Sequence, residues 1–336
     1  MSPLAHRLAG PFRWQRLRRY PELILLCFSL AVVAIGLALR LPASPPDLLS
    51  GEEMLGHYLL PLSLAILVHL GILVRSKAAR KSSAFILLVS IPTLLVVTVC
   101  HFECKAWMPL VNPHRFGALY ESVDRLLSPV VALCNHFVRL MEHAGLNVGA
   151  AYHGWFILLF FVCFGLHALY DSPTGQRQVI LGVGWILALG GVCYWIAPAV
   201  GPFIYRHGVD GEATLIQLHM WQKFTLFVTT GRIPASYFLM PPAAMPSLHI
   251  AHAAFFIWML RRISRPLSLF FVPGLLWFMV TAVGLAWHYI LDIPAGLLLA
   301  AVAVVLVRKM LPDAQPQTSP AVCAAENTAE DHLVPA

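Results

Sequence analysis

Long apolar stretches separated by short polar segments dominate the hydrophobic pattern of this chain. Each stretch approaches the length of about 20 residues with which a helix crosses the hydrocarbon core of a membrane. Apolar and polar residues do not alternate over a run long enough to build a barrel, so every span is expected to be a helix. The pattern predicts an all-α, polytopic bundle of about eight transmembrane helices, at residues 22–41, 57–74, 83–102, 151–170, 179–197, 247–262, 266–286 and 288–307.

The basic residues predict how these spans are oriented. The tail 1–21 contains five arginines, and basic loops follow the second, sixth and eighth spans at 75–81, 261–265 and 308–309. With both termini on the inner side, 15 of the 23 Lys and Arg residues lie inside and 8 lie outside, in agreement with the positive-inside bias of short loops. The termini are therefore expected in the cytoplasm. The first span could instead be a cleaved signal sequence, but its length and the basic tail before it favour a retained anchor.

Two long segments on the outer side are predicted to lie in the membrane interface. In 103–150 and in 198–246, apolar and charged residues recur at helical spacing, as in amphipathic helices that lie between lipid and water. The tail 311–336 is rich in Pro, Ala and Thr with acidic residues, and this composition predicts disorder.

The composition agrees with a membrane protein. Hydrophobic residues make up 59% of the 336 residues and charged residues 12%, about half the charged fraction of a soluble domain. The net charge of +7 therefore reflects topology, and no nucleic-acid partner is expected. The seven cysteines imply no disulfide framework, although Cys100, Cys104 and Cys134 would share the outer side. The segment "CHFEC" (100–104) resembles a metal-ligand cluster, but the end of a span with incidental polar residues is the favoured interpretation.

Three polar residues at the level of the spans need an explanation: His249, His288 and Asp292. Ionisable groups inside a membrane are costly, so they are functional candidates by default. His288 and Asp292 are four residues apart and would share one face of a helix. A carboxylate beside an imidazole keeps one ring nitrogen protonated and leaves the other with a lone pair for nucleophilic attack. A buried pair that only satisfies itself is the alternative.

The predicted topology places "MPSLH" (245–249) and "HYILD" (288–292) on the same membrane face, each at the start of a helix. Pro246 suits a first helical turn. Free backbone N–H groups and the positive end of the helix dipole favour an anion there, phosphate above all. Ser247 adds a hydroxyl donor, and His249 adds a second imidazole that can donate a proton. Together these groups predict a phosphoryl-transfer site.

"MPSLH" followed about 40 residues later by "HYILDIPAG" resembles the second and third signature motifs of the type 2 phosphatidic acid phosphatase superfamily. The form of the two motifs is similar to the inositol-phosphorylceramide synthase branch and its bacterial relatives. The resemblance implies a six-helix catalytic core at 81–310, preceded by two accessory helices at 22–80, in a bacterial inner membrane. It also implies a phosphatase or phosphotransferase, an inositolphosphotransferase in that branch, that acts on a lipid phosphate or phospholipid at the periplasmic or extracytoplasmic face.

The resemblance assigns a role to each site residue. His288 would be the nucleophile that forms a phosphohistidine, and Asp292 would orient and charge it. His249 would protonate the leaving oxygen, and Ser247 would bind a phosphoryl oxygen. Neither a metal ion nor another cofactor is expected, because helix ends and hydrogen-bond donors would stabilise the charge.

One signature of the superfamily is missing. Its first motif, a lysine followed by a spaced Arg-Pro pair, should lie in "YWIAPAVGPFIYRHG" (194–208), where Arg206 is followed by His207. The basic residues near the site are Arg206, Lys223 and Arg232. Arg206 and Arg232 are the preferred phosphate-binding residues, because a guanidinium can hold two oxygens at once. For each of them, a lipid-anchoring role at the interface is the alternative.

Two details depend on where the helices begin. Pro294 follows Asp292 by two residues, and a proline cannot continue an established helix without a kink. If the helix begins near His288, Pro294 falls near its first turn; if it begins at Pro294, His288 and Asp292 need not share a face. His252 follows His249 by three residues, and it either assists the leaving group or only contacts a neighbouring helix.

Two other functions compete with phosphoryl transfer. A membrane haem protein would use His249, His252 and His288 as axial ligands, and a transporter would bind an anion with discontinuous helices. All three histidines crowd one end of the predicted bundle, and a haem site gives Asp292 no role, so phosphoryl transfer is favoured. The head group, the acceptor and the oligomeric state do not follow from the sequence.

Overall fold

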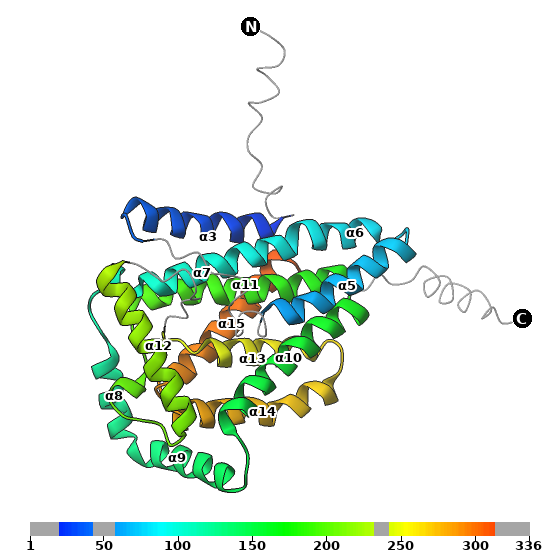
Figure 1. Cartoon of the computed structure of the whole chain (residues 1–336). Coiled ribbons are helices and arrows are strands. Elements are labelled where there is room, and N and C mark those ends of the chain that lie inside the picture. Colours follow the sequence, from blue (N-terminus) through cyan, green and yellow to red (C-terminus); the bar gives the residue numbers. More distant parts are fainter. Residues whose placement is uncertain (1–19, 43–57, 232–241, 313–336) are drawn as a thin grey trace, which may run out of the picture.

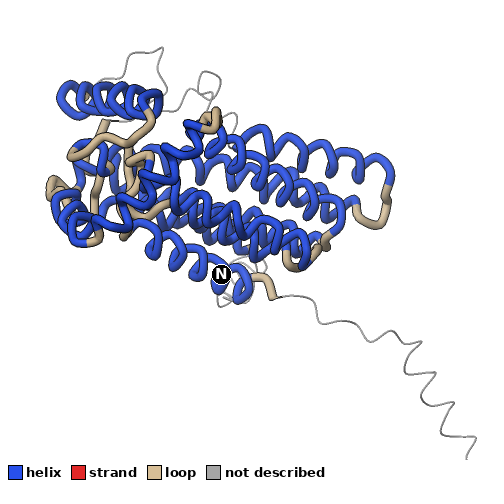
Figure 2. Tube along the Cα trace, turned by 90° about the horizontal axis from the view of Figure 1, so that it is seen from below, coloured by secondary structure: helices blue, strands red, loops and turns tan. Residues whose placement is uncertain are grey.

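The computed structural model describes residues 20–42, 58–231 and 242–312 of the chain. Most of the basic tail, nearly all of the predicted disordered tail, Arg232 and Cys323 lie outside these residues. Within them, all regular secondary structure is helical, as the hydrophobic pattern predicted. Helices run side by side in a bundle, and three others, at residues 117–126, 128–143 and 211–230, gather at one end of it (Figure 1; Figure 2).

The described residues form twelve α-helices and two short helical turns. In order they are α3 (Pro21–Ala38), α5 (Leu60–Arg75), α6 (Arg80–Phe85), the π-helical turn η2 (Ile86–Ser90), α7 (Ile91–Val111), α8 (Gly117–Leu126), α9 (Ser128–His143), α10 (Val148–Tyr170), α11 (Pro173–Ile196), the 3₁₀ turn η3 (Pro202–Ile204), α12 (Gly211–Thr230), α13 (Leu248–Leu260), α14 (Arg265–Gly284) and α15 (Asp292–Met310). The segments α6, η2 and α7 form one continuous helix.

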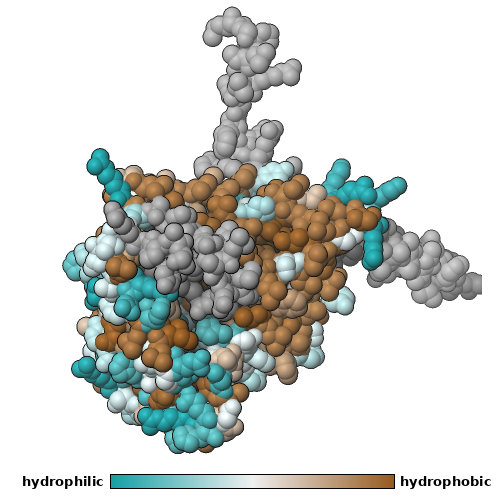
Figure 3. Space-filling view, viewed as in Figure 1, coloured by the Kyte–Doolittle hydropathy of each residue, from teal (hydrophilic) through white to brown (hydrophobic). Residues whose placement is uncertain are grey.

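Six helices in the described residues are long and apolar enough to cross a membrane: α3, the continuous α6–α7, α10, α11, α14 and α15. The two other predicted spans form the shorter apolar helices α5, of 16 residues, and α13, of 13 residues. Apolar side chains cover much of the visible face of the bundle, and polar ones gather over α8, α9 and α12 (Figure 3). The chain is therefore an integral membrane protein built as a polytopic helical bundle.

Residues 103–111 differ from the prediction that the third span ends at 102. The helix continues to Val111, because this stretch is mostly apolar. Its proline, Pro109, lies in the last turn, so it disturbs only the end of the helix. The rest of the first predicted interfacial segment forms the amphipathic helices α8 and α9, and the second contains α12. Their depth in the membrane remains a prediction.

Two helix starts also lie later than predicted. Pro246 was expected in a first helical turn, but it precedes Ser247, which occupies the N-cap position of a helix that begins at Leu248 and makes no capping bond with its side chain. The Met245–Pro246 peptide bond is cis. The last helix begins at Asp292 rather than at His288. This start places Pro294 in the first turn, where its missing N–H would have no partner in the helix in any case.

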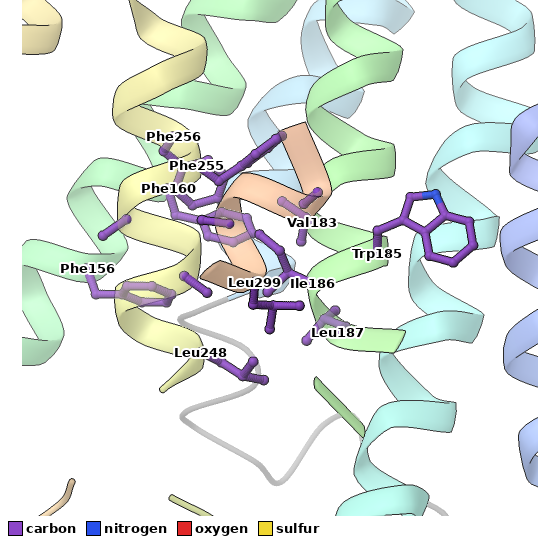
Figure 4. Close-up of a cluster of buried hydrophobic side chains, with 14 of the residues drawn as sticks. Phe156, Phe160, Val183, Trp185, Ile186, Leu187, Leu248, Phe255, Phe256 and Leu299 are labelled. Atoms are coloured by element: carbon purple, nitrogen blue, oxygen red, sulfur yellow. The ribbon is translucent and has the colours of Figure 1, made fainter. Parts of the chain in front are cut away.

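The core between α10, α11, α13 and α15 is built from aromatic and branched apolar side chains (Figure 4). Phe160 stacks on Phe164 at 4.8 Å between ring centroids and meets the edge of Phe256 at 4.7 Å. Gly182 of α11 faces Phe255 of α13 so closely that a Cβ would lie 1.9 Å from a ring atom. Helices in lipid associate through close packing at small residues, so this contact positions α13, which carries part of the candidate site.

Polar side chains also hold the bundle where α10 ends and α11 begins. Arg177 donates to both oxygens of the buried Glu22 carboxylate, at 2.7 and 2.8 Å. His167 lies 2.7 Å from Asp171, and Arg262 lies 3.6 Å from the same carboxylate. Burial alone raises the pKa of Asp171, but hydrogen bonds from His167 and from a backbone N–H, together with the Arg262 charge, bring it below its ordinary value of 3.8.

Candidate active site

The starts of α13 and α15 meet, although 41 residues separate Ser247 from His288. The Ser247 backbone N–H donates to the Asp292 carbonyl at 3.2 Å. Gly296 makes this approach possible, because a Cβ at that position would lie 2.5 Å from the Ser247 carbonyl oxygen. The structure therefore brings "MPSLH" and "HYILD" together at one end of the bundle, as the predicted topology required.

A tight turn carries His288 from the end of α14 to the start of α15. Its backbone N–H donates to the Ala282 carbonyl at 3.1 Å, and Ala286 takes up the left-handed conformation with φ of 57°. From α12, the Gln217 side-chain amide donates to the Leu285 carbonyl at 2.7 Å. A non-glycine residue in the left-handed region persists only where its surroundings fix it, and these bonds fix the turn.

The hydrogen bonds of His288 define its tautomer. Its Nδ1 lies 2.9 Å from the Ala244 carbonyl oxygen and 3.1 Å from the Asp292 carboxylate. Both partners only accept, so Nδ1 carries the proton, and the neutral ring holds its lone pair on Nε2. Nε2 lies 3.2 Å from the Ser247 Oγ, which can donate to it. This arrangement is that of an oriented nucleophile, with a carboxylate able to stabilise positive charge on the ring.

The Asp292 carboxylate is fully buried and accepts twice through Oδ2, from His288 and from the Tyr289 backbone N–H at 2.8 Å. Asp292 is the first residue of α15, where the helix dipole favours a negative charge. The prediction that His288 and Asp292 share a helical face is wrong in its geometry, because His288 precedes the helix. The pair still forms, because the turn folds His288 back over the helix start.

Arg206 braces this turn. Its guanidinium donates to Glu121 at 2.9 Å and to Asp124, both on α8. The other oxygen of Asp124 accepts the Ile290 backbone N–H at 3.0 Å. Two carboxylates thus hold the Arg206 charge, and Arg206 does not line the pocket described next, so the phosphate-binding role expected for it has no support in this arrangement.

A pocket with an empty volume of about 840 Å³, part of it open to solvent, reaches His288 and His249. Its walls come from five helices and from the turns beside α13 and α15. The lining residues are Tyr58, His101, Phe102, Lys105, Tyr152, His153, Tyr194, Val200, Met220, Pro242, Ala243, Leu248, His249, Trp287 and His288. Ser247 is fully buried beside His288.

The two remaining histidines of the motif region differ in their surroundings. His249 lines the pocket, and its ring lies 4.5 Å from the Phe156 ring. His252 is buried one turn further along α13, where its Nδ1 donates to the Leu248 carbonyl at 2.8 Å and its ring stacks on Phe256. His249 is therefore placed to meet a ligand, whereas His252 fits the alternative of a helix-contact residue.

Sequence reasoning missed several lining residues. Lys105 and His101 lie one turn apart on α7, and His153 lies on α10 beside His249, with 6.2 Å between the ring centroids. The four-residue spacing of His101 and Lys105 in "HFECK" (101–105) could have indicated a shared polar face. Lys105, however, lies beyond residue 102, where the hydrophobic pattern ends the third span.

Burial raises the pKa of the Tyr120 hydroxyl, and the Asp292 charge raises it further. Burial also raises the pKa of the Tyr289 hydroxyl, with Tyr205 and Asp292 adding to the effect. Both phenols therefore stay protonated near neutral pH, and their rings pack against each other with 5.6 Å between the centroids.

The "CHFEC" segment lies in α7, and all five of its residues are buried. Within residues 20–42, 58–231 and 242–312, no three His, Cys, Asp or Glu side chains are arranged to hold a metal ion. Cys100, Cys104 and Cys134 are buried free thiols.

The fold and the site together define a polytopic membrane protein with a buried Ser–His–Asp cluster beside a pocket. A family model for the PAP2 superfamily matches residues 117–306, more than half of the chain. The protein belongs to the PAP2 superfamily, that of the type 2 phosphatidic acid phosphatases. No curated protein and no solved structure matches the chain. Membership supports a phosphatase-type enzyme with a lipid phosphate substrate; α7 lies outside the matched residues.

Proposed function

We propose that this protein is a lipid phosphatase or phosphotransferase that works through a phosphohistidine on His288. The observation that carries the proposal is the tautomer of His288. Ala244 and Asp292 hold the proton on Nδ1, so the lone pair of Nε2 is available at the wall of the pocket. A histidine held in this way is a nucleophile suited to a phosphoryl group.

In the first step, Nε2 attacks the phosphorus atom, and the bond between phosphorus and the leaving lipid oxygen breaks. His249 donates a proton to that oxygen, so the lipid leaves as an alcohol. The Ser247 hydroxyl and the backbone N–H groups at the start of α13 bind the phosphoryl oxygens. Asp292 stabilises the positive charge that the His288 ring acquires.

In the second step, water or an alcohol attacks the phosphohistidine. His249, now neutral, accepts the proton of the attacking hydroxyl, and the bond between Nε2 and phosphorus breaks. Attack by water releases a phosphate, and attack by an alcohol yields a new phosphoester. The similarity of the motifs to the inositol-phosphorylceramide synthase branch favours an alcohol acceptor.

We place the site on the outer face of a bacterial inner membrane, with both termini in the cytoplasm. The basic loops at 75–81 and 261–265 lie at the bundle end opposite the starts of α13 and α15 (Figure 1), and basic loops stay inside. Single cysteines at Lys77 and at Arg139, in a cysteine-free background, test this in intact spheroplasts. Labelling of the Arg139 position alone by an impermeant maleimide supports the orientation, and labelling of the Lys77 position alone overturns it.

The function is tested by incubating purified protein with a panel of lipid phosphates and phospholipids, while free phosphate and new lipid products are measured. We expect turnover without added metal, inhibition by vanadate, and an acid-labile phosphoenzyme that His288→Ala abolishes. Arg139→Ala, which changes an exposed residue of α9, is the matched control. Undiminished turnover by the His288→Ala protein would overturn the mechanism, and the ratio of phosphate to transferred product separates hydrolase from transferase.

A further inference from the structure

The candidate pocket needs a positive charge that the two catalytic motifs do not supply. A phosphate monoester carries close to two negative charges near neutral pH. Of the described residues that line the pocket, Lys105 is the one lysine or arginine, and none is a carboxylate. The lysine therefore sets the sign of the charge in the pocket.

The arginine at the expected place does not provide this charge. Arg206 is bonded to Glu121 and Asp124, so the three side chains together carry one net negative charge. A cluster of that sign attracts no phosphate, and its geometry already serves the turn that holds His288.

Lys105 is held at the level of the pocket by contacts between α7 and α11. One turn before it, the His101 Nδ1 donates to the Leu187 carbonyl at 2.8 Å. The Trp195 indole N–H donates to the Cys104 carbonyl at 2.7 Å. These bonds fix the position of α7 along α11, and the half-buried Lys105 ammonium lies 6.0 Å from the centroid of the Tyr194 ring.

We propose that Lys105 binds the phosphoryl oxygens of the substrate, which rests on the function proposed above. The cation of the site then comes from α7, a helix that precedes the matched residues 117–306. A lysine meets phosphate as a point charge through its ammonium donors, and the pocket brings it to the same ligand as His249 and His288.

The test compares Lys105→Met and Lys105→Arg with Arg139→Met, which removes an exposed charge from α9. A hydrogen bond to a charged group contributes about 1.5–3 kcal/mol, so Lys105→Met should raise KM for a lipid phosphate and the inhibition constant of vanadate by about 10- to 100-fold. Lys105→Arg should recover part of the loss, and Arg139→Met should resemble the wild type.

Chemical labelling provides a measurement on the unmodified chain, which decides the matter if Lys105→Met fails to fold. We expect vanadate to slow acetylation of Lys105, measured by mass spectrometry, and to leave Lys223 unchanged as an internal reference. An unchanged vanadate constant in a folded Lys105→Met protein, or equal acetylation of Lys105 with and without vanadate, overturns the proposal for Lys105. Absence of turnover and of vanadate binding in the wild type overturns the proposed function itself.

Discussion

Replacing Gly296 with alanine adds one methyl group where the starts of α13 and α15 touch. The new Cβ would lie 2.5 Å from the Ser247 carbonyl oxygen, whereas ordinary contacts begin at 3.4 Å. The neighbouring atom belongs to the backbone, so the two helices must separate by about 0.9 Å, the difference between these distances. Overpacking of this kind costs about 1–3 kcal/mol.

The same movement bears on the chemistry. The Ser247 Oγ lies 3.2 Å from the His288 Nε2, and the added separation takes this pair beyond hydrogen-bond range. A misplacement of about 1 Å at a reacting centre can cost about 100-fold in rate. We therefore expect Gly296→Ala to lower the thermal unfolding midpoint and to reduce turnover of a lipid phosphate strongly.

Gly154→Ala in α10 is the matched control, because a Cβ at that position meets nothing within 4 Å. Thermal unfolding in detergent and a phosphate-release assay on the two purified variants give both measurements. If Gly296→Ala unfolds at the wild-type temperature and turns over as fast as Gly154→Ala, the contact between the two helix starts does not organise the site.

Two further predictions concern carboxylates, that of Asp292, which is buried, and that of Asp171, which is partly exposed. Asp292→Asn keeps an oxygen able to accept from His288 but removes the negative charge. At 3.1 Å and an effective dielectric constant near 20, the attraction between that charge and a positively charged His288 ring is about 5 kcal/mol. The kcat should therefore fall by about 10³- to 10⁴-fold with an unchanged circular dichroism spectrum, and a fall of less than about tenfold would contradict the role of the charge. The folded protein holds the pKa of Asp171 below its ordinary value of 3.8. The contacts of Asp171 with His167 and Arg262 therefore stabilise the fold fully above pH 3.8, and this stabilisation is lost as the pH falls through the lower pKa of the folded state. Thermal unfolding should show Asp171→Asn less stable than the wild type at pH 7, with a difference that shrinks in acid below about pH 4; a difference independent of pH would refute this.

Much of the fold was predictable, because the hydrophobic run length that predicts a membrane helix depends on local sequence alone. The positions of Ser247 and His288 at one end of the bundle followed from counting helix directions. The helix boundaries did not follow, since the start at Asp292 depends on hydrogen bonds between the backbone of the turn and two side chains, Asp124 of α8 and Gln217 of α12. Pro294 is compatible with both helix starts that the sequence left open, one near His288 and one at Pro294 itself.

The partners of charged side chains were the least predictable part of the site. Arg206 finds Glu121 and Asp124 more than 80 residues earlier in the chain, and no local pattern encodes that meeting. Lys105 lies beyond residue 102, where the hydrophobic pattern ends the third span, so the pattern places it in an interfacial segment rather than in the helix that continues to Val111.

The long separation in sequence between Ser247 and His288 has a consequence for the protein during its synthesis. Synthesis proceeds from the N-terminus, and α13 is complete well before the turn at His288 and the helix that follows it have been made. Ser247 therefore lacks its contact with His288 while α14, the turn and α15 are being made. In the nascent chain, the contact between Ser247 and His288 therefore forms only once the turn at His288 has been made and α15 has packed against α13.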